Sequence, residues 1–253
     1  MRIATWNLNN RVGKVRFRPE AAAAAIALGV DVLVFTEFFP RQHGDKFRAT
    51  LASAGWTGQL MSAQPSEVAN RVLIASKLPL APLNLSLPTF DQQFPANLLG
   101  VKLPTLGVSV LGVRVPWYQD QTPYLLHSAW EWLEGASDFL KTSPSVVIGD
   151  LNVQTSSAAS VASAHFRRIL LGGWQRAAPS GGATYFGRGG KKSEIDHVLA
   201  TDHCVISDAA CVQEAGGFVF AGSPSAISDH AALVCQVGLV TDSRKTNDTD
   251  ISS

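Results

Sequence analysis

The sequence predicts an α/β fold in which helices cover central β-sheets, formed as a single domain over residues 1–240. Two observations carry this prediction. The apolar runs 30–36 and 146–148 have the composition of strands that are buried on both faces. An alanine-rich helical segment connects a strand near the N-terminus to the first of these runs, and strand–helix–strand order is typical of parallel sheets with helices packed outside them.

The N-terminal elements follow in order along the chain. Arg2–Leu8 carries β-branched and aromatic residues and no helix start signal, so it is expected to be a strand. Pro19 lies at the start of the alanine-rich helix and Gly29 at its end, the positions that these two residues favour. The apolar strand 30–36 completes the unit, and 45–54 is expected to form a second helix.

The remaining elements alternate short strands with two longer helices. Prolines and glycines separate the middle strands, which indicates antiparallel pairing; these strands are expected near 57–61, 71–76, 98–103 and 108–115. Pro123 stands at the first position of a long helix with apolar residues along one face. After the apolar strand at 146–148, the expected elements are a helix over 157–171 and strands over 195–200, 211–213 and 230–239. The polar segment 241–253 is expected to be a disordered tail.

Composition limits the class of protein. The 253 residues are 46% hydrophobic and 16% charged, which excludes disorder over most of the chain. The net charge of +1 excludes a polybasic surface of the histone type, although it allows a local basic patch. Cys204, Cys211 and Cys235 have neither disulfide-framework nor zinc-site spacing. Since no signal peptide or membrane-spanning run is present, we expect a cytoplasmic monomer without a stable membrane anchor.

Short polar segments lie at the ends of the predicted strands, where open α/β sheets place their ligand sites. They are Thr5-Trp6-Asn7, Thr36-Glu37, Gly149-Asp150-Leu151-Asn152, Ile195-Asp196-His197 and Ser228-Asp229-His230. A carboxylate at the end of a buried strand is costly unless a cation accompanies it, and all but the first segment contain one. Carboxylate and amide oxygens without thiolates favour a hard cation such as Mg²⁺ or Mn²⁺.

In this order, the polar segments resemble the motifs of the endonuclease/exonuclease/phosphatase family, which includes DNase I and exonuclease III. The resemblance runs from Met1 to about Val240. It implies a four-layer α/β sandwich, in which two packed mixed β-sheets are flanked by helices. It also implies a divalent-metal-dependent phosphoesterase that uses a single in-line attack by water.

The resemblance further implies a metal site. Glu37 is expected to be the principal ligand of Mg²⁺ or Mn²⁺, with Asn7 and Asp229 as further residues at the metal. Many nucleases of the family carry aspartate where this chain has Asn9. The loss of that charge makes a pair of tight metal sites less favourable.

The remaining motif residues are expected to carry the chemistry. Asp150 matches the aspartate that accepts a proton from the attacking water, and Asn152 would hold that water or a phosphate oxygen. His230 would touch the scissile phosphate, with Asp196 as its orienting carboxylate. Arg114 stands where the family usually presents tyrosine or histidine. Because arginine keeps its charge, we expect Arg114 to clamp the phosphate rather than to donate a proton.

Other basic and aromatic residues are candidates for substrate contacts. The segment Gly187–Lys192 precedes the strand with Asp196 and lacks the GxxxxGK[ST] spacing of a nucleotide P-loop. It is expected to be a flexible basic loop, which would either contact substrate phosphates or serve only to keep the surface soluble. The candidate substrate residues are Trp117, Tyr118, Arg188, Lys191 and Lys192.

Three functions stay open, and a nuclease acting on DNA or RNA is favoured. The near-neutral charge also permits a phosphatase or phosphodiesterase acting on a small or lipid phosphoester, although the sequence has no basic amphipathic helix. A catalytically silent binding module is disfavoured because all the acid and base positions are intact. Taken singly, each motif is ordinary: Gly149–Asn152 is common turn chemistry, and His197 is expected to face away from the site.

Overall fold

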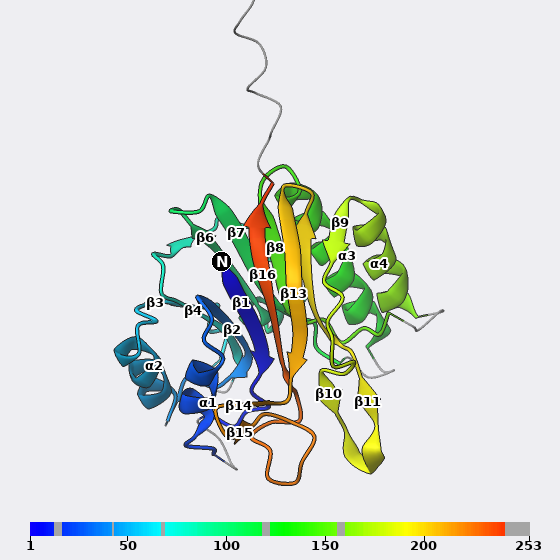
Figure 1. Cartoon of the computed structure of the whole chain (residues 1–253). Coiled ribbons are helices and arrows are strands. Elements are labelled where there is room, and N and C mark those ends of the chain that lie inside the picture. The colour runs from blue at the N-terminus through cyan, green and yellow to red at the C-terminus, as the bar shows by residue number, and fades with distance from the viewer. Residues whose placement is uncertain (13–16, 42, 67–68, 118–121, 156–159, 241–253) are drawn as a thin grey trace, which may run out of the picture.

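The computed structural model describes residues 1–12, 17–41, 43–66, 69–117, 122–155 and 160–240 (Figure 1). Two six-stranded sheets form its centre. The first sheet contains, in spatial order, β13 (Cys204–Val212), β16 (Ala232–Leu239), β1 (Arg2–Asn7), β2 (Val32–Phe38), β4 (Arg71–Ser76) and β3 (Gly58–Met61). The second contains β5 (Ala81–Pro82), β6 (Leu98–Leu103), β7 (Val108–Arg114), β8 (Ser145–Asp150), β12 (Asp196–Thr201) and β9 (Trp174–Arg176).

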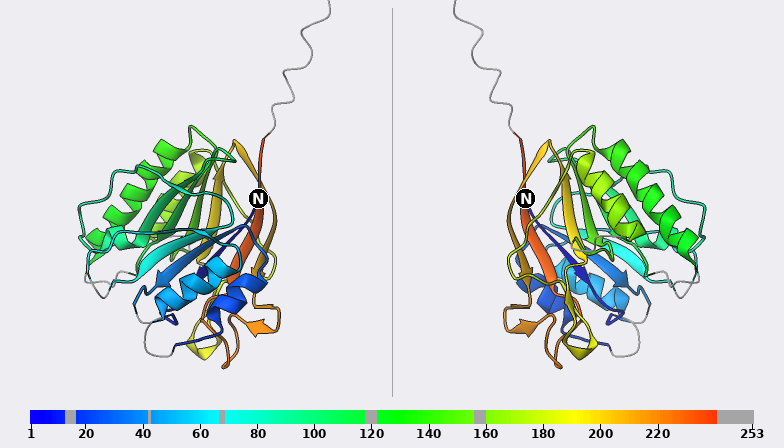
Figure 2. Two further views of the ribbon diagram at one scale, coloured as in Figure 1. Left: turned by 90° about the vertical axis from the view of Figure 1, so that its left-hand side faces the viewer. Right: turned by 90° about the vertical axis from the view of Figure 1, so that its right-hand side faces the viewer.

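Helices cover the outer face of each sheet (Figure 2). The pair α1 (Ala21–Ala27) and α2 (Gly44–Ser53) packs on the first sheet, and the pair α3 (Pro123–Leu140) and α4 (Val161–Leu171) packs on the second. The smaller elements are the 3-10 helices η1 (Phe94–Asn97) and η2 (Arg188–Gly190) and the strand pairs β10 (Tyr185–Phe186) with β11 (Lys192–Ser193) and β14 (Glu214–Ala215) with β15 (Phe218–Val219). The predicted four-layer sandwich is therefore confirmed.

The apolar core forms three layers that explain the composition of the central strands. Val34 and Ile148 lie in the layer between the sheets, whereas Phe35 faces α2 and Val147 faces α3 and α4. A strand covered by a sheet on one face and by helices on the other needs apolar residues on both faces. The continuous runs in β2 and β8 are confirmed as doubly buried strands for this reason.

Three free cysteines lie in the layer between the sheets: Cys204, Cys211 and Cys235. Burial raises the pKa of the Cys211 and Cys235 thiols to about 12, so both stay protonated at neutral pH. They serve as small apolar residues, as the sequence indicates. No helix in the described part of the chain is long and apolar enough to cross a membrane.

One sequence expectation needs correction, and it concerns the length of a strand. A short strand was expected at 211–213, but β13 extends over Cys204–Val212. It is an edge strand whose apolar residues are interrupted by the exposed Ser207 and Asp208, at a register shift between Ser207 and Ala210, so its first half does not show a continuous pattern. The expected loop Gly187–Lys192 connects β10 with β11 in a hairpin and contains the short helix η2.

Two other predicted segments include residues that the structure does not describe. The helix expected over 157–171 begins at Val161, where the Ser160 hydroxyl caps it by accepting a hydrogen bond from the Ser163 amide at 3.1 Å. Residues 157–159 and the predicted tail 241–253 lie outside the described residues.

Candidate active site

Each sheet has a pair of parallel strands at its centre, and the ends of these strands bring the polar residues together. β1 pairs with β2 in parallel, and so does β7 with β8. Asn7 ends β1, Arg114 ends β7 and Asp150 ends β8, while Glu37 is the last residue but one of β2. Parallel strands present their carboxyl ends at one edge, which is where α/β sheets bind ligands. The predicted residues thus come from both sheets.

The backbone at these strand ends departs from regular β geometry. Glu37 has a φ of 51°, and the pairing of β2 with β4 shifts register between Phe35 and Phe38. Asn152 has a φ of 49°. Left-handed backbone at residues other than glycine costs about 1–3 kcal/mol and is concentrated at functional sites.

Gly149 is required immediately before Asp150. Its φ is 147°, and a Cβ atom at this position would lie 1.9 Å from the carbonyl oxygen of Val113 on β7. The close approach of β7 and β8 therefore admits only glycine here, and it fixes the position of the Asp150 carboxylate at the end of β8.

Gly149→Ala is expected to lower the free energy of unfolding by about 3 kcal/mol or more, because it adds backbone strain to a steric clash. Urea denaturation measures this change. Gly135→Ala on the exposed face of α3 is the matched control, since a Cβ atom there meets nothing within 4 Å. That substitution is expected to stabilise by roughly 0.5–1 kcal/mol through helix propensity. Equal effects of the two substitutions would contradict the steric argument.

Asp150 is buried and held by two amides. Its Oδ2 accepts hydrogen bonds from Asn7 Nδ2 at 2.9 Å and Asn152 Nδ2 at 3.2 Å, and its Oδ1 accepts one from the Asn152 backbone at 3.1 Å. Burial first, and then the negative charge of Asp196, raise the pKa of Asp150 to about 7 against the opposing charges of His230 and Arg114. A carboxylate with a pKa near neutrality is suited to accept a proton from water.

His230 and Asp196 form the second half of the site. His230 Nδ1 lies 2.8 Å from Asp196 Oδ2, and the pairing of β12 with β8 places Asp196 directly opposite Asp150. Burial by itself lowers the pKa of His230, but the charge and hydrogen bond of Asp196, followed by the charges of Asp150 and Asp229, outweigh it and raise the pKa to about 9. The imidazole is therefore charged at neutral pH. The predicted contact between Asp196 and His230 is present in the structure.

Two side chains hold this arrangement in place. The Ser228 hydroxyl donates to the Asn7 carbonyl oxygen at 2.7 Å and accepts from the His230 amide at 3.2 Å. The Thr184 hydroxyl accepts hydrogen bonds at 3.0 Å from the amides of Ile195 and Asp196. Sequence reasoning gave neither hydroxyl a role, because no local motif indicates the bond from Ser228 to Asn7, 221 positions away, or the two bonds to Thr184.

Glu37 carries a separate cluster. Its Oε1 accepts from Arg114 Nε at 3.0 Å and lies 2.8 Å from Arg114 Nη2, while its Oε2 accepts from Asn10 Nδ2 at 2.8 Å. Arg114 Nη1 also donates to Asn97 Oδ1 at 3.4 Å. Asn10 and Asn97 were missed in the sequence; only the repeated asparagines at 9 and 10 gave a signal.

The donor atoms near Glu37 fit a hard divalent ion. The Oδ1 atom of Asn10 is buried and has no hydrogen-bond partner among the described residues, while the Nδ2 atom of the same amide donates to Glu37. In the part of the chain that the structure describes, no three His, Cys, Asp or Glu side chains form a group that could hold a metal ion. Mg²⁺ commonly takes one or two carboxylates and keeps several waters, so Glu37, an amide oxygen and waters are a suitable set.

The other predicted metal residues occupy different surroundings. Asn7 bonds to Asp150 and, through its Oδ1 atom, accepts from the Asn9 amide at 2.8 Å, so the structure brings it to the proposed base. Asp229 is about one-third exposed, and its Oδ1 atom lies 4.0 Å from His230 Nε2. Their predicted roles at the metal stay predictions.

A cleft of about 1460 Å³ opens beside Asp229. The β10–β11 hairpin, which extends away from the sheets at the lower right of Figure 1, forms one wall. The segment after β1 and the segment 222–229 form the others. The cations that line it are Arg11, Arg18, Arg188, Lys191 and Lys192. The three basic residues predicted on the hairpin therefore lie together in a basic cleft.

The base of the hairpin is joined directly to the site. The Phe186 amide donates to the Asp229 carbonyl oxygen at 2.8 Å, and the Ala231 amide donates to the Thr184 carbonyl oxygen at 2.7 Å. The ring of Tyr185 lies 5.1 Å from the imidazole of His230, centroid to centroid. The β10–β11 hairpin, which carries the basic residues, is thus hydrogen-bonded to the backbone on both sides of His230.

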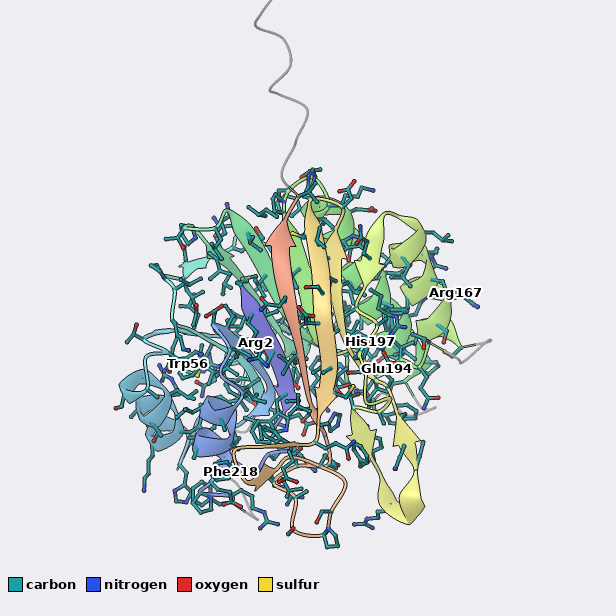
Figure 3. All side chains as sticks on the ribbon, viewed as in Figure 1. Arg2, Trp56, Arg167, Glu194, His197 and Phe218 are labelled. Carbon is teal, nitrogen blue, oxygen red and sulfur yellow. The ribbon has the colours of Figure 1, made fainter. Side chains whose placement is uncertain are left out.

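The structure describes one of the two aromatic candidates. Trp117 has a side chain that is 72% exposed and is not among the described residues that line the cleft, and Tyr118 lies outside the described residues. His197 is buried on the opposite face of β12, near Glu194 (Figure 3), and its Nε2 atom lies 2.8 Å from the Val153 carbonyl oxygen. It is structural, as its position in the strand predicts.

Comparison with known proteins agrees with this geometry. The family described as Endonuclease/Exonuclease/phosphatase matches residues 4–230. The chain belongs to this family. No curated protein matches the chain at the level of sequence. The predicted class, a phosphoesterase of the nuclease and phosphatase type, is confirmed at the level of the family.

Solved structures share the family fold. A 3' phosphatase, NExo, from Neisseria bound to a product DNA hairpin has a TM-score of 0.71 and 22% identity, over 94% of this chain and 99% of that one. An AP endonuclease from Archaeoglobus fulgidus has a TM-score of 0.66 and 21% identity, over 93% and 98%. A family member from Beutenbergia cavernae has a TM-score of 0.69 and 20% identity, over 94% and 71%. At these identities the similarity concerns the fold.

Proposed function

We propose that the protein is a Mg²⁺- or Mn²⁺-dependent nuclease that hydrolyses phosphodiester bonds of DNA or RNA. The observation that carries this proposal is the pairing of two buried acid–base groups at one edge of the sandwich, Asp150 held by amides and His230 held by Asp196. A basic cleft opens beside them. The similar proteins from Neisseria and Archaeoglobus fulgidus are described as a DNA phosphatase complex and an AP endonuclease, which supports a nucleic-acid substrate.

The side chains of the site divide the reaction between them. Asn152 and Asp150 would orient a water, and an Asp150 oxygen would take its proton as the new phosphorus–oxygen bond forms and the bond to the leaving oxygen breaks. The charged imidazole of His230 would donate a hydrogen bond to a phosphate oxygen. Arg114 would clamp another oxygen. A divalent ion held by Glu37, with the Asn10 amide oxygen near it, supplies further charge neutralisation at the phosphate.

A single set of assays tests this function. The purified protein is incubated with plasmid DNA, single-stranded DNA, RNA and bis-p-nitrophenyl phosphate, each with Mg²⁺ or Mn²⁺ and then with EDTA. Metal-dependent cleavage of a polymer supports the nuclease. Turnover of the small ester alone would favour the phosphatase or phosphodiesterase alternative. A protein that binds no Mn²⁺ and turns over no substrate would favour the silent binding module.

The basic residues of the hairpin are expected to contribute to the binding of DNA or RNA and not to the binding of small esters. The triple variant Arg188→Gln/Lys191→Gln/Lys192→Gln should raise KM for DNA or RNA and leave turnover of bis-p-nitrophenyl phosphate unchanged, because the small ester does not reach the hairpin. Each lost phosphate contact should reduce the slope of log KM against log salt by about 0.9.

The matched control places the same charge loss elsewhere. Lys46, Lys102 and Lys141 are exposed and do not line the described cleft, so their replacement by glutamine should leave the salt slope unchanged. An equal loss of polymer binding in both triple variants would show that total charge, rather than the hairpin, governs binding.

We also propose that the protein is a cytoplasmic monomer. Free buried thiols are typical of a reducing compartment, and all three cysteines are of this kind. Light scattering during size-exclusion chromatography measures the mass in solution.

A further inference from the structure

The proposed metal ligand, Glu37, is already engaged by a cation of the protein itself. Two nitrogens of the Arg114 guanidinium contact one oxygen of Glu37, at 2.8 and 3.0 Å, and the Asn10 amide contacts the other at 2.8 Å. The side chains of Arg114 and Glu37 are 20% and 14% exposed, so solvent screens the pair only weakly. We propose that Arg114 couples metal binding to substrate binding: it occupies Glu37 until a substrate phosphate draws it away. This inference rests on the proposed function.

The first step of the argument concerns charge. A divalent ion at Glu37 must share the carboxylate with the guanidinium or displace it. Two cations at one carboxylate repel one another, and partial burial increases that repulsion. The protein without substrate therefore binds a divalent ion weakly at this position, and a change that removes the guanidinium charge strengthens binding.

The second step concerns the place to which the guanidinium can move. Its third nitrogen contacts Asn97 at 3.4 Å, a longer and neutral interaction, and Arg114 lies directly opposite Asp150 in the pairing of β7 with β8. A phosphate positioned for attack by an Asp150-bound water is thus within the range of Arg114. Phosphate is a bidentate partner for arginine with at least the strength of a carboxylate. When Arg114 binds the phosphate, its contacts with the Glu37 oxygen break and that oxygen becomes available to the ion.

The third step follows from linkage. If phosphate binding raises the affinity for the ion, the ion raises the affinity for phosphate by the same factor, and such factors are commonly about 5- to 150-fold. A structural ion pair between Arg114 and Glu37 would leave only the coupling that comes from direct attraction between ion and phosphate, and that coupling would be the same without the guanidinium. The same side chain would then serve only to keep β2 and β7 together.

Mn²⁺ binding, measured by electron paramagnetic resonance without any turnover, tests this inference on the full chain. Dimethyl phosphate serves as the phosphate probe because it is a diester too unreactive to be consumed. In the wild type, saturating dimethyl phosphate is expected to tighten Mn²⁺ binding at least about 5-fold. Arg114→Met, which keeps the aliphatic volume, should bind Mn²⁺ about 10-fold more tightly than the wild type and gain less from the diester than the wild type does.

Two further variants separate coupling from structure. Arg168→Met removes the 2.7 Å ion pair between Arg168 on α4 and Glu134 on α3, and it is expected to leave Mn²⁺ affinity and its response to diester unchanged. Arg114→Lys keeps the charge, and it should keep Mn²⁺ binding as weak as in the wild type. If Arg114→Met does not fold, Arg114→Gln, which also removes the charge, replaces it in the same measurement.

The outcomes distinguish this inference from the proposed function. Wild-type affinity that does not respond to diester, or an Arg114→Met affinity equal to that of the wild type, overturns the coupling even when metal-dependent cleavage is observed. If the wild type binds no Mn²⁺ in either condition and cleaves nothing, the proposed function fails and the coupling fails with it.

Discussion

Asp150→Asn is expected to reduce kcat by about 10²–10⁴-fold, the usual contribution of a positioned general base. Asparagine keeps the shape and can keep the hydrogen bond to the Asn7 side chain after rotation of its amide, but it cannot take a proton from water. The fall should be in kcat rather than in KM, because the variant retains the cleft and the hairpin. Steady-state kinetics on the best substrate from the assays above measures both constants.

The stability of Asp150→Asn separates chemistry from folding. Burial and the charge of Asp196 raise the pKa of Asp150 to about 7, so the ionised carboxylate is unfavourable in the folded protein. Above pH 7 the variant should therefore unfold at the same temperature as the wild type or a higher one. Asp138→Asn on the exposed surface of α3 is the control for loss of one negative charge. Near-normal turnover by Asp150→Asn would remove Asp150 from its role as base.

Asp196→Asn is expected to remove a pH-dependent part of the stability. The pKa of His230 is about 9 in the folded protein, against an ordinary value of 6.5, so the folded state holds this proton more tightly. Its stabilising contribution is fully present below pH 6.5 and is lost as the pH rises through about 9. A difference of this size corresponds to about 3 kcal/mol, of which roughly 1.4 kcal/mol is lost between pH 8 and pH 10.

Urea unfolding at pH 8 and pH 10 in EDTA measures this loss. The range excludes most of the titration of Asp150, whose raised pKa also makes stability fall as the pH rises through about 7. In Asp196→Asn the difference in the free energy of unfolding between pH 8 and pH 10 should be smaller than in the wild type by about the 1.4 kcal/mol that comes from His230. In addition, kcat should fall because the imidazole loses its orienting partner. The same pH dependence in both proteins would mean that the Asp196–His230 pair does not hold the proton.

The sequence could predict the parts of the fold that depend on burial. β2 and β8 are apolar on both faces because each lies between a sheet and helices, and the composition records that environment directly. The edge strand β13 is interrupted by the exposed Ser207 and Asp208, and the short β10–β11 hairpin buries little, so neither shows the continuous pattern of a buried strand. Hydrophobic pattern carries no information about a strand whose side chains face water.

The candidate site could be predicted to a similar extent. Motif order identified Asp150, Asp196 and His230, and the structure brings these three together. It did not reveal that Arg114 bonds to Glu37, 77 positions away, or that Asn10 bonds to the same carboxylate. Such contacts arise from the packing of one sheet on the other, which no local pattern encodes. The substrate roles of Arg188, Lys191 and Lys192, and all metal roles, stay predictions.

The three buried thiols provide the protein with an internal reporter. They lie where the sheets meet, protonated and shielded from reagents. A thiol-specific dye can reach Cys235, on the inner strand β16, only when the sandwich opens. At a dye concentration at which labelling is faster than reclosing, the rate of labelling under native conditions therefore measures how often the two sheets part. Since Asn7 and Glu37 come from one sheet and Asp150 from the other, that rate also gives the lifetime of the assembled site.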